Sequence, residues 1–277
     1  MTEAFESIGL EPLGRLRRDL RASAALMKPE EARYLVDLYY TIQENRIRSA
    51  HQERTSEEIE EPTDIVTWCA AAFLRMENEI KAALHVYAKG SPVGLWALSQ
   101  HGIGPVITAG LLSHIDIERA PTVGHIWRFA GLDPTVRWEK KTKRPWNARL
   151  KTLCWKIGDS FVKFHNHEKC VYGKVYEARK AQEIERNVAG VFADQAAASL
   201  AEKRFKESAT RTAYEAGRLP DGRIDLRARR YAVKLFLSHY HHVAFECRYG
   251  TPPPKPYIIE HGGHVHFVKP PNWPMVE

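Results

Sequence analysis

Cysteine is scarce in this sequence, and its placement suits neither a disulfide framework nor a metal site. The chain has four, Cys69, Cys154, Cys170 and Cys247, and none belongs to a Cys-x-x-Cys pair. Scattered cysteines of this kind are typical of reduced thiols in a cytoplasmic protein.

Long apolar runs are also absent. No stretch approaches the roughly 20 residues of a transmembrane helix. The first residues, 1–14, include acidic side chains and lack the apolar core of a secretory signal. There is no Walker-type or dinucleotide-binding glycine loop. We therefore expect a soluble cytoplasmic protein with no membrane partner and no cofactor.

Acidic residues are outnumbered by basic ones. The chain has 34 Asp and Glu against 41 Lys and Arg, a formal net charge of +7. An excess of positive charge favours a polyanionic partner only where the cations cluster. The placement of the cations along the chain therefore decides whether such a partner is expected.

Apolar residues recur three and four positions apart over most of the chain, which is typical of amphipathic helices. Pro29 and the acids after it suit a helix start, and Thr63 with Asp64 suits another. We predict a mainly α fold with a helical N-terminal region over 1–90. These helices form either a hairpin within the chain or a coiled coil that makes a homo-oligomer.

Two further regions follow. Residues 91–180 contain the motifs described below, and residues 181–277 are predicted as a helical C-terminal region. The tripeptide Pro252-Pro253-Pro254 should end the last helix. Short stretches rich in apolar residues on either side of Gly262-Gly263 then predict a small β-hairpin near the C-terminus, over 257–268.

A pair of glycines separates two apolar helical segments at Gly102-Ile103-Gly104-Pro105. Glycine permits positive φ and close backbone approach, Pro105 suits a first helical turn, and the small Ala109 would let two helices approach. The backbone N–H groups at such a turn suit a phosphate and read no base. We predict a helix-hairpin-helix DNA contact; the alternative is an ordinary tight turn. The residues expected there are His101, Gly102, Ile103, Gly104, Val106 and Thr108.

A related pattern at 121–134 has a single glycine at its turn, Gly131, and an aspartate, Asp133, where a phosphate would lie. It is expected to end a helix at Gly131 and to give packing support to the first hairpin.

A basic stretch follows directly. Cations neutralise phosphates, and interleaved aromatic rings can stack on exposed bases. Trp138 and Trp146 are interleaved in this way, whereas Trp155 is expected on a helix with its side chain in the protein core. A second basic cluster lies between Arg223 and Lys234, and the sequence does not say whether it joins the same surface. The cations expected to contact DNA are Arg137, Lys140, Lys141, Lys143, Arg144, Arg149 and Lys151.

Three motifs in order carry a family resemblance. They are Gly102-Ile103-Gly104-Pro105 with Ala109, Leu111 and Leu112, then Ala130-Gly131-Leu132-Asp133-Pro134, then Lys143-Arg144 with Asn147, Leu150 and Leu153. With this spacing, residues 76–180 resemble the C-terminal, helix-hairpin-helix domain of the insertion-sequence one-ten family of DEDD transposases. The resemblance implies DNA handling in recombination or a mobile element.

Two departures from the family bear on catalysis. Members carry a RuvC-like domain with four metal-binding acids, and the first ninety residues here have no strand-Asp-strand pattern. The family's nucleophilic serine lies shortly after the segment matching Gly131 to Pro134, but residues 135–142 contain no serine. We therefore expect the DNA-handling half of such a transposase, with no catalytic residue.

Histidines offer a competing interpretation. His239, His241 and His242 form one group, and His261, His264 and His266 form another; Cys247 or Glu260 could complete a zinc site. The spacing favours histidines that pack on the helical body, so no metal is expected. We predict a DNA-binding protein of the nucleoid, with duplex or structured DNA as partner. The alternatives are an active recombinase or metal-dependent nuclease, and an RNA-binding scaffold.

Overall fold

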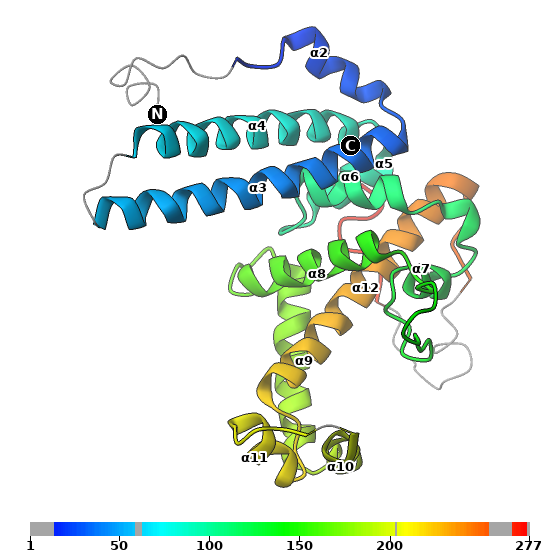
Figure 1. The fold of residues 1–277 in the computed structure, drawn as a ribbon. Coiled ribbons are helices and arrows are strands. Elements are labelled where there is room, and N and C mark those ends of the chain that lie inside the picture. Colours follow the sequence, from blue (N-terminus) through cyan, green and yellow to red (C-terminus); the bar gives the residue numbers. More distant parts are fainter. Residues whose placement is uncertain (1–13, 59–62, 203, 255–267, 276–277) are drawn as a thin grey trace. The chain divides into compact units, whose positions relative to one another are not determined.

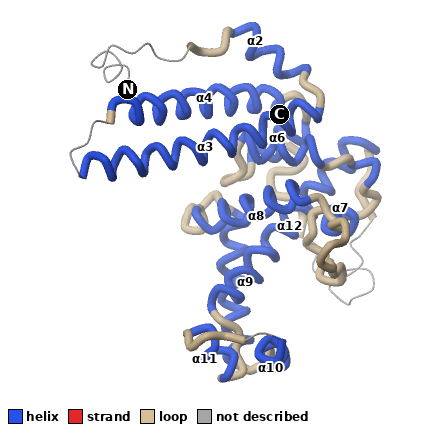
Figure 2. The backbone as a smooth tube through the Cα atoms, in the orientation of Figure 1, coloured by secondary structure: helices blue, strands red, loops and turns tan. Residues whose placement is uncertain are grey.

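The computed structural model describes residues 14–58, 63–202, 204–254 and 268–275, and its regular elements there are all helices (Figures 1 and 2). The predicted mainly α fold is confirmed, while residues 257–267 of the predicted β-hairpin lie outside the described part. No helix in these ranges combines the length and apolarity needed to cross a bilayer. The helices are α2 (Arg18–Ala22), η1 (Ser23–Leu26), α3 (Pro29–Glu58), α4 (Asp64–Lys89), α5 (Pro92–Ser99), α6 (Pro105–His114), η2 (Ile117–Arg119), α7 (Val123–Phe129), α8 (Ala148–Lys163), α9 (Val171–Val188), α10 (Ala193–Glu202), α11 (Ala209–Glu215) and α12 (Asp221–Tyr249).

The contacts divide the chain into two compact units that are not the regions predicted at 1–90, 91–180 and 181–277. The first unit holds Met1–Leu98 and Gly104–Asp116, and the second holds Ser99–Ile103 and Ile117–Glu277. The difference arises because α6 supplies core residues to the N-terminal helices, and because α12 binds the central and C-terminal helices into one body.

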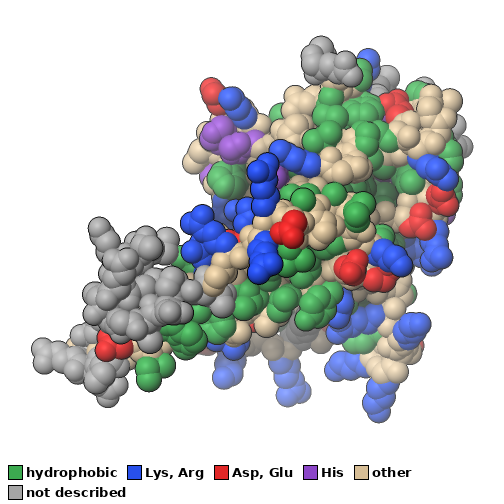
Figure 3. All heavy atoms as spheres, turned by 90° about the horizontal axis from the view of Figure 1, so that it is seen from above, with side chains coloured by type: hydrophobic (Ala, Val, Ile, Leu, Met, Phe, Trp, Pro, Cys, Tyr) green, Lys and Arg blue, Asp and Glu red, His purple; other side chains and the backbone are tan. Residues whose placement is uncertain are grey.

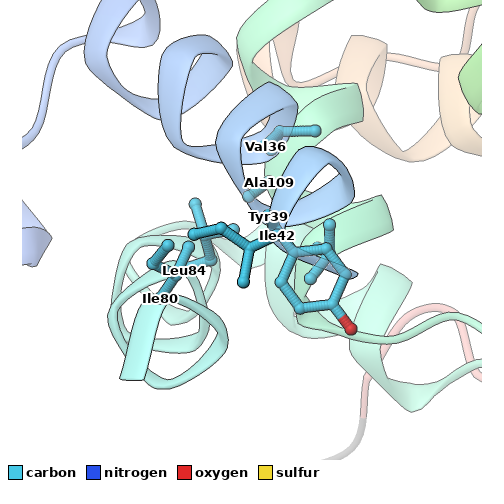
Figure 4. Close-up of a cluster of buried hydrophobic side chains, with 7 residues drawn as sticks. Val36, Tyr39, Ile42, Ile80, Leu84 and Ala109 are labelled. Atoms are coloured by element: carbon cyan, nitrogen blue, oxygen red, sulfur yellow. The ribbon is translucent and has the colours of Figure 1, made fainter. Parts of the chain in front are cut away.

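The first unit is built on α3 and α4, which lie side by side as an antiparallel pair (Figure 1). Figure 4 shows Tyr39 and Ile42 of α3 facing Leu84 of α4. Helix α6 closes this core with Val106 and Ala109. The sequence left open a hairpin or a coiled coil, and the structure shows that α3 and α4 form a hairpin within the chain.

The second unit is organised by α12, which contacts α7, α8 and α9. Its centre is aromatic: Phe161 of α8 stacks on Tyr172 of α9, and both rings meet Phe236 of α12 edge to face. A smaller apolar cluster includes Phe192, Ala196 and Tyr214 near α10 and α11. These contacts fix α8 against α12, and that pair forms the site described next.

Candidate nucleic-acid interface

The first glycine of the predicted hairpin is fixed by contacts inside the second unit. Gly102 has φ +94°, a left-handed conformation that favours glycine. The hydroxyl of Ser160 donates a hydrogen bond of 2.5 Å to the Gly102 carbonyl. A Cβ added at Gly102 would lie 3.3 Å from the Ser160 Oγ. The turn therefore needs glycine here, as the sequence predicted.

The neighbouring imidazole, His101, is stacked rather than free. Its ring lies parallel to that of His167, with centroids 3.7 Å apart and 10° between the planes, and edge-on to Phe164. Burial, and then the charges of His167 and Lys169, lower the pKa of His101. The lowered pKa favours the uncharged ring, which contributes less positive charge to a phosphate.

The second glycine, Gly104, belongs to the first unit and precedes α6. It has an extended conformation, φ −93° and ψ 177°, and no side chain caps the helix start within the described residues. A Cβ there would have no heavy atom within 4 Å. The side chains of Val106 and Thr108 are buried, and the Thr108 N–H donates to the Gly104 carbonyl at 3.0 Å. Neither of these predicted contact residues therefore presents its side chain to a phosphate.

The packing of α6 differs from the expected helix-hairpin-helix arrangement. We expected Ala109 to let the two helices flanking the glycines approach each other. Instead Ala109 lies in the core that α6 shares with α3 and α4. A small residue at this position permits close packing against any helix, so the sequence alone does not predict which helix packs there.

The basic stretch forms a loop whose ends are held together, here called the basic loop (residues 132–146). The Asn147 backbone N–H donates to the Phe129 carbonyl at 2.8 Å, and the Asn147 side chain caps α8 by accepting from the Leu150 N–H at 3.0 Å. At the other end, Gly131 has φ +66° beneath the Trp146 ring. The predicted helix end at Gly131 is confirmed, and α7 packs on α12.

Alternating rings and cations shape the basic loop. The Arg144 guanidinium lies 5.3 Å from the Trp138 ring centroid, and Trp138 meets Trp146 edge to face at 6.5 Å. The Lys151 Nζ lies 4.1 Å from the Trp146 centroid. These contacts order the loop while the charges remain at the surface.

The cations of the loop have no acidic partners among the residues that the structure describes. Arg137, Lys140, Lys141, Lys143 and Lys151 are exposed, and none joins an ion pair there. Arg144 and Arg149 are exposed as well. On the face drawn in Figure 3, Lys and Arg are interspersed with acidic and hydrophobic side chains.

One cation of the second basic cluster, Arg230, lines the same pocket as Lys151, which the sequence alone could not show. Arg227 and Arg229 are instead ion-paired to carboxylates. Burial lowers the pKa of Lys151, and nearby Arg230 and Arg144 lower it further. Burial lowers the pKa of Arg230 as well, and the charges of Arg227 and Arg223 lower it further. Cations from α8 and α12 thus crowd together. The basic loop, Lys151 and Arg230 are here called the basic surface.

A pocket of about 310 Å³, the α8–α12 pocket, lies beside these cations. The turn after α7, helix α8 and the first half of α12 line it. The expectation that Trp155 lies in the core is wrong, because its side chain is 52% exposed and lines the pocket. A helical tryptophan next to a buried Cys154 gives no sequence signal of which way it faces.

Carboxylates near the site are committed to other groups. Asp159 pairs with Lys163 at 2.9 Å and Arg229 at 3.5 Å. Asp133 accepts the Thr135 backbone N–H at 2.9 Å and its hydroxyl at 2.7 Å. Within the described ranges, no group of three or more potential ligands is placed to hold a metal ion.

The histidines of α12 also serve packing. His239 is hydrogen-bonded to the Tyr172 hydroxyl at 2.8 Å and to the Val268 carbonyl at 2.9 Å. His241 is hydrogen-bonded to the Ala120 carbonyl at 2.8 Å, and His242 lies 3.1 Å from Glu246. The other group, His261, His264 and His266, lies outside the described residues.

Comparison with known proteins adds no relative. No protein-family model, no curated protein and no solved structure matches this chain. The resemblance to insertion-sequence transposases therefore rests on its three short motifs alone, and the functional argument rests on the site.

Proposed function

We propose that this chain is a DNA-binding protein that holds the duplex backbone largely without sequence preference, in a recombination or mobile-element setting. The observation that carries the proposal is the basic surface: the exposed cations of one ordered loop, with Lys151 and Arg230, none of which joins an ion pair within the described part of the chain. Phosphates would supply the missing negative charge.

The geometry supports contact with the backbone more than recognition of base edges. The cations lie on an irregular loop, Leu132–Trp146, whereas base-specific proteins usually place a helix or β-ribbon in the major groove. Point charges on long flexible side chains contact phosphates at any sequence. Association with the nucleoid is the cellular counterpart of this proposal.

The hairpin contributes a second, separate contact under this proposal. The α6 N-terminus offers uncapped N–H groups, and these together with the helix dipole suit a phosphate. The side chains of α6 pack in the core of the first unit, so this helix can offer DNA only its N-terminal backbone. We therefore assign α6 to positioning the DNA, and the basic surface to most of the binding affinity.

Neutralising the basic loop is expected to weaken DNA binding strongly. The triple variant Arg137→Gln, Lys140→Gln, Lys143→Gln removes three exposed charges. Each lost phosphate contact should lower the slope of log K against log salt by about 0.9. We expect roughly a tenfold to hundredfold loss of affinity at 0.1 M salt, measured by fluorescence anisotropy on a labelled duplex.

The matched control removes the same charge elsewhere. Arg48→Gln, Lys174→Gln, Arg211→Gln takes away cations that each pair with a neighbouring glutamate on their own helix. It should bind DNA within about twofold of the unaltered protein, because net charge alone is not the cause. Equal losses in both triple variants would contradict the proposal. So would tighter binding of structured RNA, or metal-dependent nicking of supercoiled plasmid.

Gly104→Ala tests the hairpin without disturbing the fold. The added methyl group meets no heavy atom within 4 Å, and the backbone there is extended. We expect the melting temperature to change by no more than about 3 °C. Affinity for duplex DNA should fall about threefold to tenfold, because the methyl group occupies the approach of a phosphate. Unchanged affinity would leave Gly104 with a structural role only.

A further inference from the structure

The α8–α12 pocket has an apolar floor and a polar rim. Cys154 and Val233 are buried beneath it, and Gly158 brings the two helices close: a Cβ on Gly158 would lie 3.3 Å from a Val233 methyl group. Leu132 and Leu226 add apolar walls. At about 310 Å³ the pocket is at the lower end of small-ligand sites, which span roughly 300–1,000 Å³.

Three cations line the rim, and they differ in whether they are ion-paired. Arg229 is neutralised, since it pairs with Asp225 at 2.5 Å and with Asp159 at 3.5 Å. Lys151 and Arg230 have no acidic partner within the described residues, and each is crowded by other cations. The lining also holds one carboxylate, Asp133, which accepts two hydrogen bonds from Thr135 and pairs with neither cation among the described residues. Two cations without an ion-pair partner favour an anionic group at the pocket mouth.

An aromatic face adjoins these charges. Trp155 lines the pocket with a half-exposed indole, and the Lys156 Nζ lies 5.7 Å from the ring centroid. Exposed tryptophan beside cations is the combination that proteins use to hold unpaired bases, because every base has a face that stacks. A paired base presents no such face, since its neighbours in the duplex already cover it.

We propose that the α8–α12 pocket receives one unpaired nucleotide of a DNA strand, with its base against Trp155 and its phosphate on Lys151 and Arg230. The pocket is continuous with the basic surface through Lys151, so the strand that leaves the pocket is held by the basic loop. This inference rests on the proposed function and narrows its substrate to DNA with an extrahelical or single-stranded base.

The test compares two DNAs on the same protein. A labelled duplex with one unpaired adenosine and the same duplex without it are titrated by anisotropy. The full chain should bind the bulged duplex roughly tenfold more tightly. Trp155→Ala should reduce that ratio to about one while leaving affinity for the perfect duplex within twofold. Trp155→Phe, which keeps a stacking ring, should retain most of the preference.

A second variant separates charge from stacking. Arg230→Gln should lower the preference for the bulged duplex several-fold, whereas Arg211→Gln, in an ion pair on α11, should not change it. Circular dichroism melts establish that each variant is folded. A ratio near one in the unaltered protein, or a preference that survives Trp155→Ala, would overturn the inference while duplex binding stands. Absence of binding to either DNA would instead overturn the proposed function.

Discussion

Gly94→Ala is expected to destabilise the first unit severely. A Cβ on Gly94 would lie 1.8 Å from the carbonyl oxygen of Ala88 and 2.9 Å from its carbonyl carbon. Those are backbone atoms of α4, so no side-chain rotation relieves the overlap. Helix α5 would have to move away from α4 by more than an ångström. We expect a loss of about 3–5 kcal/mol, as for severe overpacking.

The measurement is thermal unfolding by circular dichroism. A loss of that size should lower the melting temperature by about 10 °C or more. Gly104→Ala is the matched control, because it makes the same chemical change where a Cβ meets no atom within 4 Å. Similar melting temperatures for the two variants would mean that α4 and α5 are not packed as described.

Glu183→Gln is expected to have a comparable effect on the second unit. The Glu183 side chain is fully buried and ion-paired to Arg179, to Arg186 at 3.1 Å and to Arg227 of α12 at 2.7 Å. A neutral amide leaves three guanidinium groups around a site with no counter-charge. Breaking a buried pair in this way costs about 3–5 kcal/mol; the partly exposed arginines place the expected loss near 3 kcal/mol.

The same carboxylate predicts a pH dependence. Burial alone would raise the pKa of Glu183, but hydrogen bonds and charges from Arg227 and Arg179 outweigh it and hold the pKa below its ordinary value. A lowered pKa in the folded state stabilises the protein above the pKa of the unfolded chain, about 4.3. That contribution is lost as pH falls through the folded-state pKa.

We therefore expect the gap in melting temperature between the unaltered protein and Glu183→Gln to be widest near pH 7. It should narrow progressively below about pH 4. The control is Glu215→Gln, which breaks an exposed pair with Arg211 on α11 and should cost less than about 0.5 kcal/mol. A gap that stays constant from pH 7 to pH 3 would show that the loss comes from shape and not from charge.

The sequence predicted the helices better than the contacts between them. Apolar spacing and the start signals at Pro29 and Thr63 locate α3 and α4, whose bounds are Pro29–Glu58 and Asp64–Lys89. Such signals are local, because they depend on the periodicity and terminal chemistry of one helix.

Long-range contacts had no comparable signal. Nothing local marks Gly94 as a close approach to α4, or Glu183 as the anion shared by three arginines. Trp155 was misplaced because a helix period shows which residues share a face and does not show how deep that face is buried. The cations of the basic loop could be named from sequence, while their junction with Arg230 required α12 to be folded against α8.

The placement of Ser99–Ile103 has a consequence for how this protein can be divided or inherited. This short segment belongs to the second unit, although the residues on both sides of it belong to the first. A fragment that begins at Ile117 would lack the Gly102 carbonyl to which Ser160 donates and the His101 ring on which His167 stacks. Neither unit is a continuous stretch of the gene, so a single crossover between genes cannot transfer one whole unit without part of the other.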